Sequence, residues 1–319
     1  SNLDQALQFT LKSLDLDPVS STTQMNLGSI YRDLGQTDNA LIATVKAIEL
    51  DTGSIEALQN LKNLASDLKI SSSNRNYARI AYEKLLNCDD FSHRKLCHLF
   101  IQEYIEDIQK AAKLNPIISD QNYTFHKLAS DWRFRKSLTL LIPPHQNIEE
   151  FLSRLRKEFL IQAINNNIIT KSLRPLLEAL ATQCFLNEYV YWQSEEEKKW
   201  KENLIEKARK SKAAFNQYLP VIGCYIPIHY IINGEDELDK YPITSDESRA
   251  FIDTQYKEVQ AEKATKILLR SSEKIFDTVS LAVQKMYEEN PYPRYQYADH
   301  TSSHFTKPPV EFISPETTI

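Results

Sequence analysis

Apolar residues recur along this chain at the spacing that places them on one face of an α-helix. Tyr77, Ile80, Ala81 and Leu85 illustrate the pattern, because steps of three and four residues return to the same side of a helix. Only residues 218–232 combine enough β-branched and aromatic residues to suggest a strand. The pattern therefore predicts an all-α protein. Beyond residue 70, we expect long helices at residues 93–114, 147–167, 171–192, 194–211, 244–270 and 272–290.

Residues 2–18 and 36–52 are similar to each other at an offset of 34 residues. Seven of the 17 aligned positions are identical, which is enough to indicate an internal repeat. The segment between them supplies a second helix, in which Gly28 suits a close approach of the paired helix and Gly35 suits a helix C-terminus. Residues 55–67 continue the pattern in a less regular form. The identical pairs are Asp4/Asp38, Ala6/Ala40, Leu7/Leu41, Thr10/Thr44, Lys12/Lys46, Leu16/Leu50 and Asp17/Asp51.

A 34-residue period built from two short amphipathic helices is typical of tetratricopeptide repeats, and residues 2–68 resemble that family. Because such arrays need about three repeats to bury a continuous core, we expect residues 1–70 to be the C-terminal end of a longer array. The period stops after residue 70, and we expect an all-helical middle region at residues 71–289 and a Pro-containing linker at residues 290–319. The predicted fold is a short helical solenoid, then an irregular helical bundle, then a Pro-rich extended tail.

Composition excludes several classes of function. The chain has five glycines in 319 residues, and no two lie closer than seven residues, so no Gly-rich nucleotide or dinucleotide loop can be written. The net charge of −5 gives no basic footprint for nucleic acid or for an anionic membrane. No apolar stretch reaches the about 20 residues of a transmembrane helix. The four cysteines form no C-x-x-C pair, which favours reduced thiols and a cytoplasmic location.

Asn26 and Asn60 occupy the same place in successive repeats. A side-chain amide offers both a donor and an acceptor, so stacked amides can hold the backbone of an extended polypeptide without reading its sequence. This arrangement resembles the asparagine ladder in the repeat superhelix of O-GlcNAc transferases. The alternative is that the two amides bond only between helices. The residues that we expect on the peptide-binding side are Thr22, Met25, Asn26, Ser29, Arg32, Asp33 and Asn60.

Two further groups of polar residues favour structure over chemistry. Cys88, His93, Cys97 and His98 are potential metal ligands within eleven residues, but consecutive helical residues point about 100° apart, and we predict no metal site. Residues 195–199 read as an acidic, solvated first turn, with Ser194 and Glu197 forming a capping box. No catalytic residue is predicted, because no paired carboxylates or nucleophile elbow stand out.

Two segments have more distinctive sequences than the groups above. Residues 183–191 (QCFLNEYVY) place Asn187 and Glu188 on a helix that should be largely buried, where the simplest interpretation is a polar pair bonded internally. Residues 287–295 (YEENPYPRY) should end a long helix at Asn290, because the residue before a proline is disfavoured in the α region. The two prolines then force an extended track that presents aromatic side chains and Arg294.

The order of these features is similar to that in bacterial tetratricopeptide-repeat proteins with a C-terminal class I S-adenosylmethionine-dependent methyltransferase domain. The family motif is close to Y-E-E-N-P-Y-P-R-W, and this chain departs from it only at Tyr295. In that family a Rossmann-like domain follows and binds the cofactor through a Gly-rich loop. The resemblance implies that S-adenosylmethionine serves the full-length protein, with no cofactor bound by these residues. The residues implied at the domain-docking or active-site edge are Tyr287, Asn290, Tyr292, Arg294 and Tyr295.

These observations predict the polypeptide-binding, non-catalytic region of a methyltransferase. Its expected partners are a polypeptide in the repeat groove and a methyltransferase domain in cis, with neither nucleic acid nor membrane. One alternative is a stand-alone scaffold for protein–protein interaction. Another is the accessory region of a repeat-linked glycosyltransferase. The methyl acceptor does not follow from the sequence.

Overall fold

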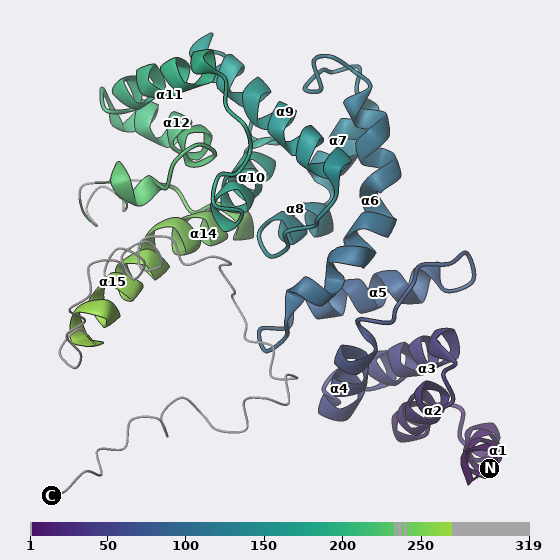
Figure 1. The fold of residues 1–319 in the computed structure, drawn as a ribbon. Coiled ribbons are helices and arrows are strands. Elements are labelled where there is room, and N and C mark those ends of the chain that lie inside the picture. Colours follow the sequence, from purple (N-terminus) through teal and green to yellow (C-terminus); the bar gives the residue numbers. More distant parts are fainter. Residues whose placement is uncertain (1, 233, 235–237, 239–240, 270–319) are drawn as a thin grey trace, which may run out of the picture.

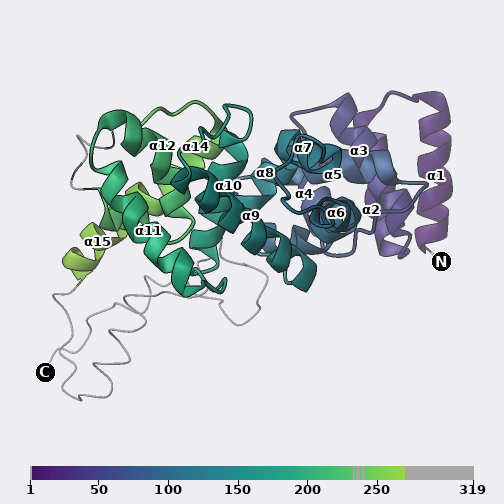
Figure 2. The same cartoon turned by 90° about the horizontal axis from the view of Figure 1, so that it is seen from above.

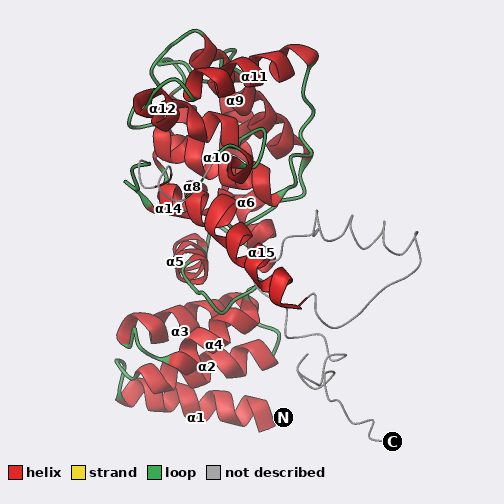
Figure 3. Ribbon diagram, turned by 90° about the vertical axis from the view of Figure 1, so that its left-hand side faces the viewer, coloured by secondary structure: helices red, strands yellow, loops and turns green. Residues whose placement is uncertain are grey.

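The computed structural model describes residues 2–269 except 233, 235–237, 239 and 240. Within these ranges all regular structure is helical (Figure 3), as the periodicity predicts. The expected tail at residues 290–319 and the expected helix at 272–290 lie outside the described residues. The described part is elongated, with the first helices at one end and α9 (Gln146–Ile164) to α15 (Glu258–Leu269) toward the other (Figures 1 and 2).

Five helices form the N-terminal end, and a 3₁₀ turn and three further helices connect them to the rest. The first group comprises α1 (Asn2–Leu16), α2 (Ser21–Asp33), α3 (Thr37–Leu50), α4 (Ile55–Leu64) and α5 (Arg75–Leu86). A 3₁₀ turn η1 (His93–Leu96), α6 (Cys97–Ala112), α7 (Tyr123–Ser130) and α8 (Trp132–Leu138) follow. The remaining elements after α9 are α10 (Arg174–Leu186), α11 (Glu195–Ala208), α12 (Lys212–Gly223), the 3₁₀ turn η2 (Ile228–Tyr230), α14 (Asp246–Ile252), the π-helical segment η3 (Asp253–Lys257) and α15.

The strand suggested at residues 218–232 is wrong, because α12 continues through Gly223 and η2 follows. Consecutive residues from Tyr218 to Gly223 are all buried. When every side of a segment is buried, its apolar run has no period, and a buried helix cannot be told from a buried strand. Ser211, whose hydroxyl accepts a hydrogen bond from the Ala214 amide, starts this helix as an N-cap.

The α2–α3 hairpin is set by two glycines, as the sequence predicts. A Cβ atom added at Gly28 would lie 2.5 Å from Thr44 Oγ1 and 3.3 Å from the Thr44 amide nitrogen, so only glycine lets the helices approach this closely. Gly35 has φ +72°, and its amide donates to the Arg32 carbonyl. The following amide of Gln36 donates to the Tyr31 carbonyl, which completes a Schellman motif and ends α2.

Helices α1 and α3 have similar sequences but very different burial. Leu41 and Thr44 in α3 are fully buried, whereas the equivalent Leu7 and Thr10 in α1 are only half-buried. Phe9 is 69% exposed, although its equivalent in α3, Ala43, is buried. The difference arises because α2 and α4 both cover α3, while α1 packs against α2. Similar sequence therefore contributes unequally to stability in the two repeats.

This inequality is testable with one substitution made twice. Leu41→Ala should lower the free energy of unfolding by about 3 kcal/mol, because it removes a fully buried side chain and leaves a cavity. Leu7→Ala should cost about 1 kcal/mol or less, because its side chain retains contact with water in the folded state. Urea unfolding of the two variants checks this. Equal losses of stability would contradict the difference in burial.

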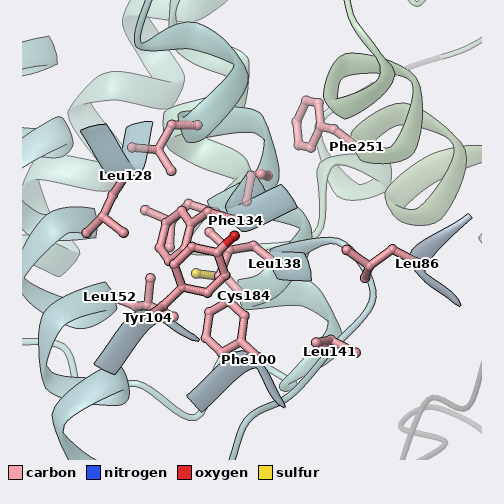
Figure 4. Close-up of a cluster of buried hydrophobic side chains, with 14 of the residues drawn as sticks. Leu86, Phe100, Tyr104, Leu128, Phe134, Leu138, Leu141, Leu152, Cys184 and Phe251 are labelled. Atoms are coloured by element: carbon pink, nitrogen blue, oxygen red, sulfur yellow. The ribbon is translucent and has the colours of Figure 1, made fainter. Parts of the chain in front are cut away.

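The centre of the molecule is an aromatic core shared by α6, α7, α8, α9 and α10 (Figure 4). The ring of Phe134 lies 5.7 Å from that of Phe100 and 5.2 Å from that of Tyr104, between centroids. Leu128 and Leu152 pack beside them in the same view. This core joins the N-terminal helices to the C-terminal ones, because α8 contacts α5 as well as α10.

Candidate functional site

The helices α2 and α4 begin in the same way, and this fixes the position of their amides. Ser20 and Ser54 are N-caps, and each hydroxyl accepts a hydrogen bond at 3.2 Å from the amide three residues later. Asn26 and Asn60 are therefore both the sixth residue of their helices. The two helices contact each other, so these equivalent positions belong to neighbouring elements.

We call the exposed and half-exposed side of these helices the polar face. Its α2 residues recur at intervals of three and four, and none is buried. Asn60 Nδ2 donates to Ser29 Oγ at 2.9 Å, which shows that α4 faces α2 on this side. Its members are the seven residues predicted for polypeptide binding: Thr22, Met25, Asn26, Ser29, Arg32, Asp33 and Asn60.

The two asparagines differ in their present partners. One amide hydrogen of Asn60 forms a hydrogen bond to α2, as expected if the asparagines only bond between helices. Asn26 is exposed and makes no side-chain hydrogen bond to the described residues. Arg32 and Asp33 pair with each other at 3.0 Å, so this charge pair is neutral as a unit. The polar face thus presents the Asn26 amide, which has no partner among the described residues, the partly used Asn60 amide and the Arg32–Asp33 ion pair.

Two further amides of α4 were not predicted from the sequence. Gln59 and Asn63 are exposed on α4, and Gln59 Nε2 donates to Asn63 Oδ1 at 3.1 Å. The signal was available, because residues four apart lie on one side of a helix. Their inclusion makes the exposed surface of α4 rich in amides around Asn60.

The four potential metal ligands between residues 88 and 98 each have other contacts. Cys88 Sγ donates to the Lys84 carbonyl, and His98 Nε2 lies 2.7 Å from the Leu68 carbonyl oxygen. Cys97 Sγ points to the Ile142 carbonyl oxygen at 3.7 Å. No three metal-ligating side chains cluster among the residues that the structure describes. The contacts of Cys97 and His98 join segments distant in sequence, whereas that of Cys88 is local.

The ring of His93 is buried, and this should make stability depend on pH. Burial, with the nearby charge of Lys136, lowers the pKa of His93 from 6.5 to about 4. Between these values the unfolded chain binds a proton that the folded chain does not, so stability rises as pH increases through this window. From pH 7 to pH 4.5 the loss attributable to His93 is about 2–3 kcal/mol.

A His93→Phe variant removes this titration and should flatten the pH dependence of the free energy of unfolding between pH 4.5 and pH 7. Urea unfolding at several pH values measures the effect. His126→Phe, which replaces a half-buried histidine on α7, is the matched control and should retain the slope. An unchanged slope in the His93 variant would contradict a buried neutral imidazole.

The acidic turn at residues 195–197 is only partly solvated, which corrects the sequence expectation. The capping box forms as predicted, with the Ser194 amide donating to Glu197 Oε2 at 2.9 Å. However, Glu197 is buried and accepts a hydrogen bond from the Tyr225 hydroxyl at 3.1 Å. Its other neighbour is the fully buried Arg156, whose Nη2 lies 3.7 Å from Oε1. The sequence did not show this pair because its partners are 41 residues apart.

A second buried carboxylate lies on α10. Glu178 accepts hydrogen bonds from the Tyr241 hydroxyl at 2.6 Å and from Arg174 Nε at 3.0 Å. Burial raises the pKa of Glu178 above its usual range, while these two partners oppose the shift. Tyr241 is itself buried, and burial raises its pKa well above 10. Because the group is enclosed by protein side chains, its arrangement is that of a structural ion pair rather than an exposed catalytic acid.

The segment 183–191 differs from its prediction. Helix α10 ends at Leu186, so Asn187 is its C-cap and Glu188 lies beyond it. Glu188 and Tyr189 have positive φ, at 55° and 56°, which ends the helix before residue 192. Asn187 is buried as expected, but Glu188 is only half-buried. Sequence patterning could not detect this end, because no glycine or proline marks it.

The residues implied at the domain-docking or active-site edge lie outside the described residues. This concerns all five of them: Tyr287, Asn290, Tyr292, Arg294 and Tyr295. They remain predictions from the motif.

Comparison with known proteins gives no family for the chain. No protein-family model matches it, and neither a curated protein nor a solved structure matches it. Among the described helices, none has both the length and the apolar character needed to cross a bilayer.

Proposed function

We propose that this chain is the polypeptide-binding, non-catalytic helical region of an S-adenosylmethionine-dependent methyltransferase. The observation that carries polypeptide binding is the position of Asn26 and Asn60, which are equivalent residues on two adjacent helices with identical N-caps. Both amides lie on the polar face, where neither is buried. The 34-residue similarity of the helices supports assigning this end of the chain to a tetratricopeptide-type solenoid.

The chemistry of the polar face suits an extended backbone. Each peptide unit of such a ligand carries one donor and one acceptor, and an asparagine amide can satisfy either. Asn26 is available for this role, and Asn60 has a second amide hydrogen and its oxygen beyond the bond to Ser29. Met25 supplies an adaptable apolar contact beside them. Recognition by this surface would select an unfolded or extended segment more than a particular sequence.

The methyltransferase part of the proposal rests on the resemblance of residues 287–295 to the family motif. Methyl transfer would require S-adenosylmethionine, which the family binds through a Gly-rich loop. The spacing of the five glycines allows no such loop in these residues, so we assign no residue of this chain to the cofactor. The proposed contribution of the chain is to hold a polypeptide close to a catalytic domain.

Polypeptide binding can be tested with two fluorescein-labelled 15-residue peptides of unrelated, uncharged composition. Both should bind with similar affinity, because the amides contact the backbone. The Asn26→Ala/Asn60→Ala double variant should bind each peptide about tenfold more weakly, as expected for the loss of one or two net hydrogen bonds. Fluorescence anisotropy measures the dissociation constants.

Asn39→Ala is the matched control, because Asn39 is an exposed amide on α3 rather than on α2 or α4. It should leave both affinities unchanged. Equal affinity of the double variant and the unmodified chain would exclude the amides from binding. Binding of only one of the two peptides would contradict recognition through the backbone.

A further inference from the structure

A cavity of about 300 Å³ lies where α8 contacts the start of α14, beside the end of α5 (Figure 3). Its volume is at the lower end of the about 300–1,000 Å³ that is usual for small-molecule sites. The cavity therefore suits a compact ligand. Which ligand it suits depends on the charges that line it.

One pair of opposite charges in the cavity wall is already matched. Arg135 Nε lies 2.6 Å from Glu247 Oε1, and only 16% and 9% of these two side chains are exposed. Arg135 Nη1 also donates to the Ala129 carbonyl at 2.8 Å. This ion pair joins α8 to α14 and is neutral as a unit, so it gives the cavity no net charge.

The uncharged polar groups of the wall are engaged within their own helices. Asn87 Nδ2 and Thr139 Oγ1 each donate to a backbone carbonyl at 2.8 Å. The Ser245 hydroxyl accepts a hydrogen bond from an amide in the first turn of α14. These groups shape the cavity, and they leave its selectivity to the remaining charged residues.

Two further charges line the cavity from different elements. Lys136 comes from α8 and is half-buried, and Asp246 comes from the first turn of α14 and is exposed. Within the part of the chain that the structure describes, neither forms an ion pair, so they are not paired with each other. Both an ammonium group and a carboxylate are therefore available to a ligand in this cavity.

This pair of opposite charges discriminates between ligand classes. A purely anionic ligand would meet the carboxylate of Asp246, and a purely cationic one would meet the ammonium group of Lys136. An uncharged ligand would leave both without a partner. A ligand that carries one positive and one negative group can satisfy both at once.

We propose that this cavity binds an apolar α-amino acid in its zwitterionic form. The carboxylate of the ligand pairs with Lys136, and its ammonium group pairs with Asp246. Its side chain packs against the ring of Trp132, which lines the cavity and is 41% exposed. This site shares no residue with the polar face, and the proposal does not depend on polypeptide binding there.

The test is a titration of the unmodified chain with L-phenylalanine and three relatives, followed by nuclear magnetic resonance. The indole N–H signal of Trp132, assigned with a Trp132→Phe variant, should shift saturably with L-phenylalanine. 3-Phenylpropionate lacks the ammonium group, phenylethylamine lacks the carboxylate and glycine lacks the ring. Each should bind about tenfold more weakly, as expected for the loss of one charge-assisted hydrogen bond or of the ring contact.

Two single variants assign the charges to the groups of the ligand. Lys136→Gln should weaken binding of L-phenylalanine about tenfold but should not weaken binding of phenylethylamine, which has no carboxylate. Asp246→Asn should weaken binding of L-phenylalanine similarly but should not weaken binding of 3-phenylpropionate. Urea unfolding should show both variants to be folded, because both side chains keep contact with water.

Lys113→Gln/Glu150→Gln is the matched control, because these two residues line a separate cavity of about 270 Å³ between α6 and α9. It should leave all affinities unchanged, and weaker binding by it would place the ligand in that other cavity. An unshifted Trp132 signal, equal affinity for the four ligands, or full binding of L-phenylalanine by Lys136→Gln or Asp246→Asn would each overturn the proposal.

Discussion

The arrangement of the C-terminal helices depends on the burial of one charge, that of Arg156. A guanidinium removed from water must be surrounded by acceptors, because an unpaired buried charge is strongly destabilising. The acceptors come from separate places: two carbonyls in the turn after α10, and the Glu197 carboxylate of α11 at a longer distance. The guanidinium also lies 4.5 Å from the centre of the Tyr225 ring. This requirement fixes α9, α11 and the turn relative to one another.

Gln255 has a comparable role without a charge. Its amide donates to the carbonyls of Ala181 and Gly223 at 2.7 and 3.0 Å, and its oxygen accepts from the Ile228 amide at 3.2 Å. The same oxygen accepts from the hydroxyl of Tyr189 at 3.3 Å. The residue lies in the π-helical segment η3, where the helix is locally widened. The turn is thus held by the Arg156 guanidinium through the Tyr191 and Trp192 carbonyls and by the Gln255 amide through the Tyr189 hydroxyl.

The extent to which the sequence predicts this structure varies with the kind of interaction. Local effects were predictable: the Gly35 helix end and the Ser194 capping box follow from residue types at short spacing, and the close approach at Gly28 was expected from the repeat pattern. Pairs such as Arg156 with Glu197 were not, because they join residues distant in sequence. The end of α10 was missed because non-glycine residues adopt positive φ there only with tertiary support. In the candidate site, the residues of the polar face could be predicted from the repeat spacing. The exposure of Trp192 could not, because it depends on where the turn after α10 lies.

The polar face offers hydrogen-bonding groups on regular helices. If it binds a polypeptide as proposed, it would contact the backbone and accept segments of different sequence.

Nuclear magnetic resonance of the side-chain amides tests the central claim, polypeptide binding by the polar face, most directly. On titration with an uncharged 15-residue peptide, the ¹⁵N–¹H₂ signals of Asn26 and Asn60 should shift progressively, while that of Asn39 on α3 stays in place. Shifts confined to residues away from α2 and α4, or an unperturbed Asn26 at saturation, would contradict the account.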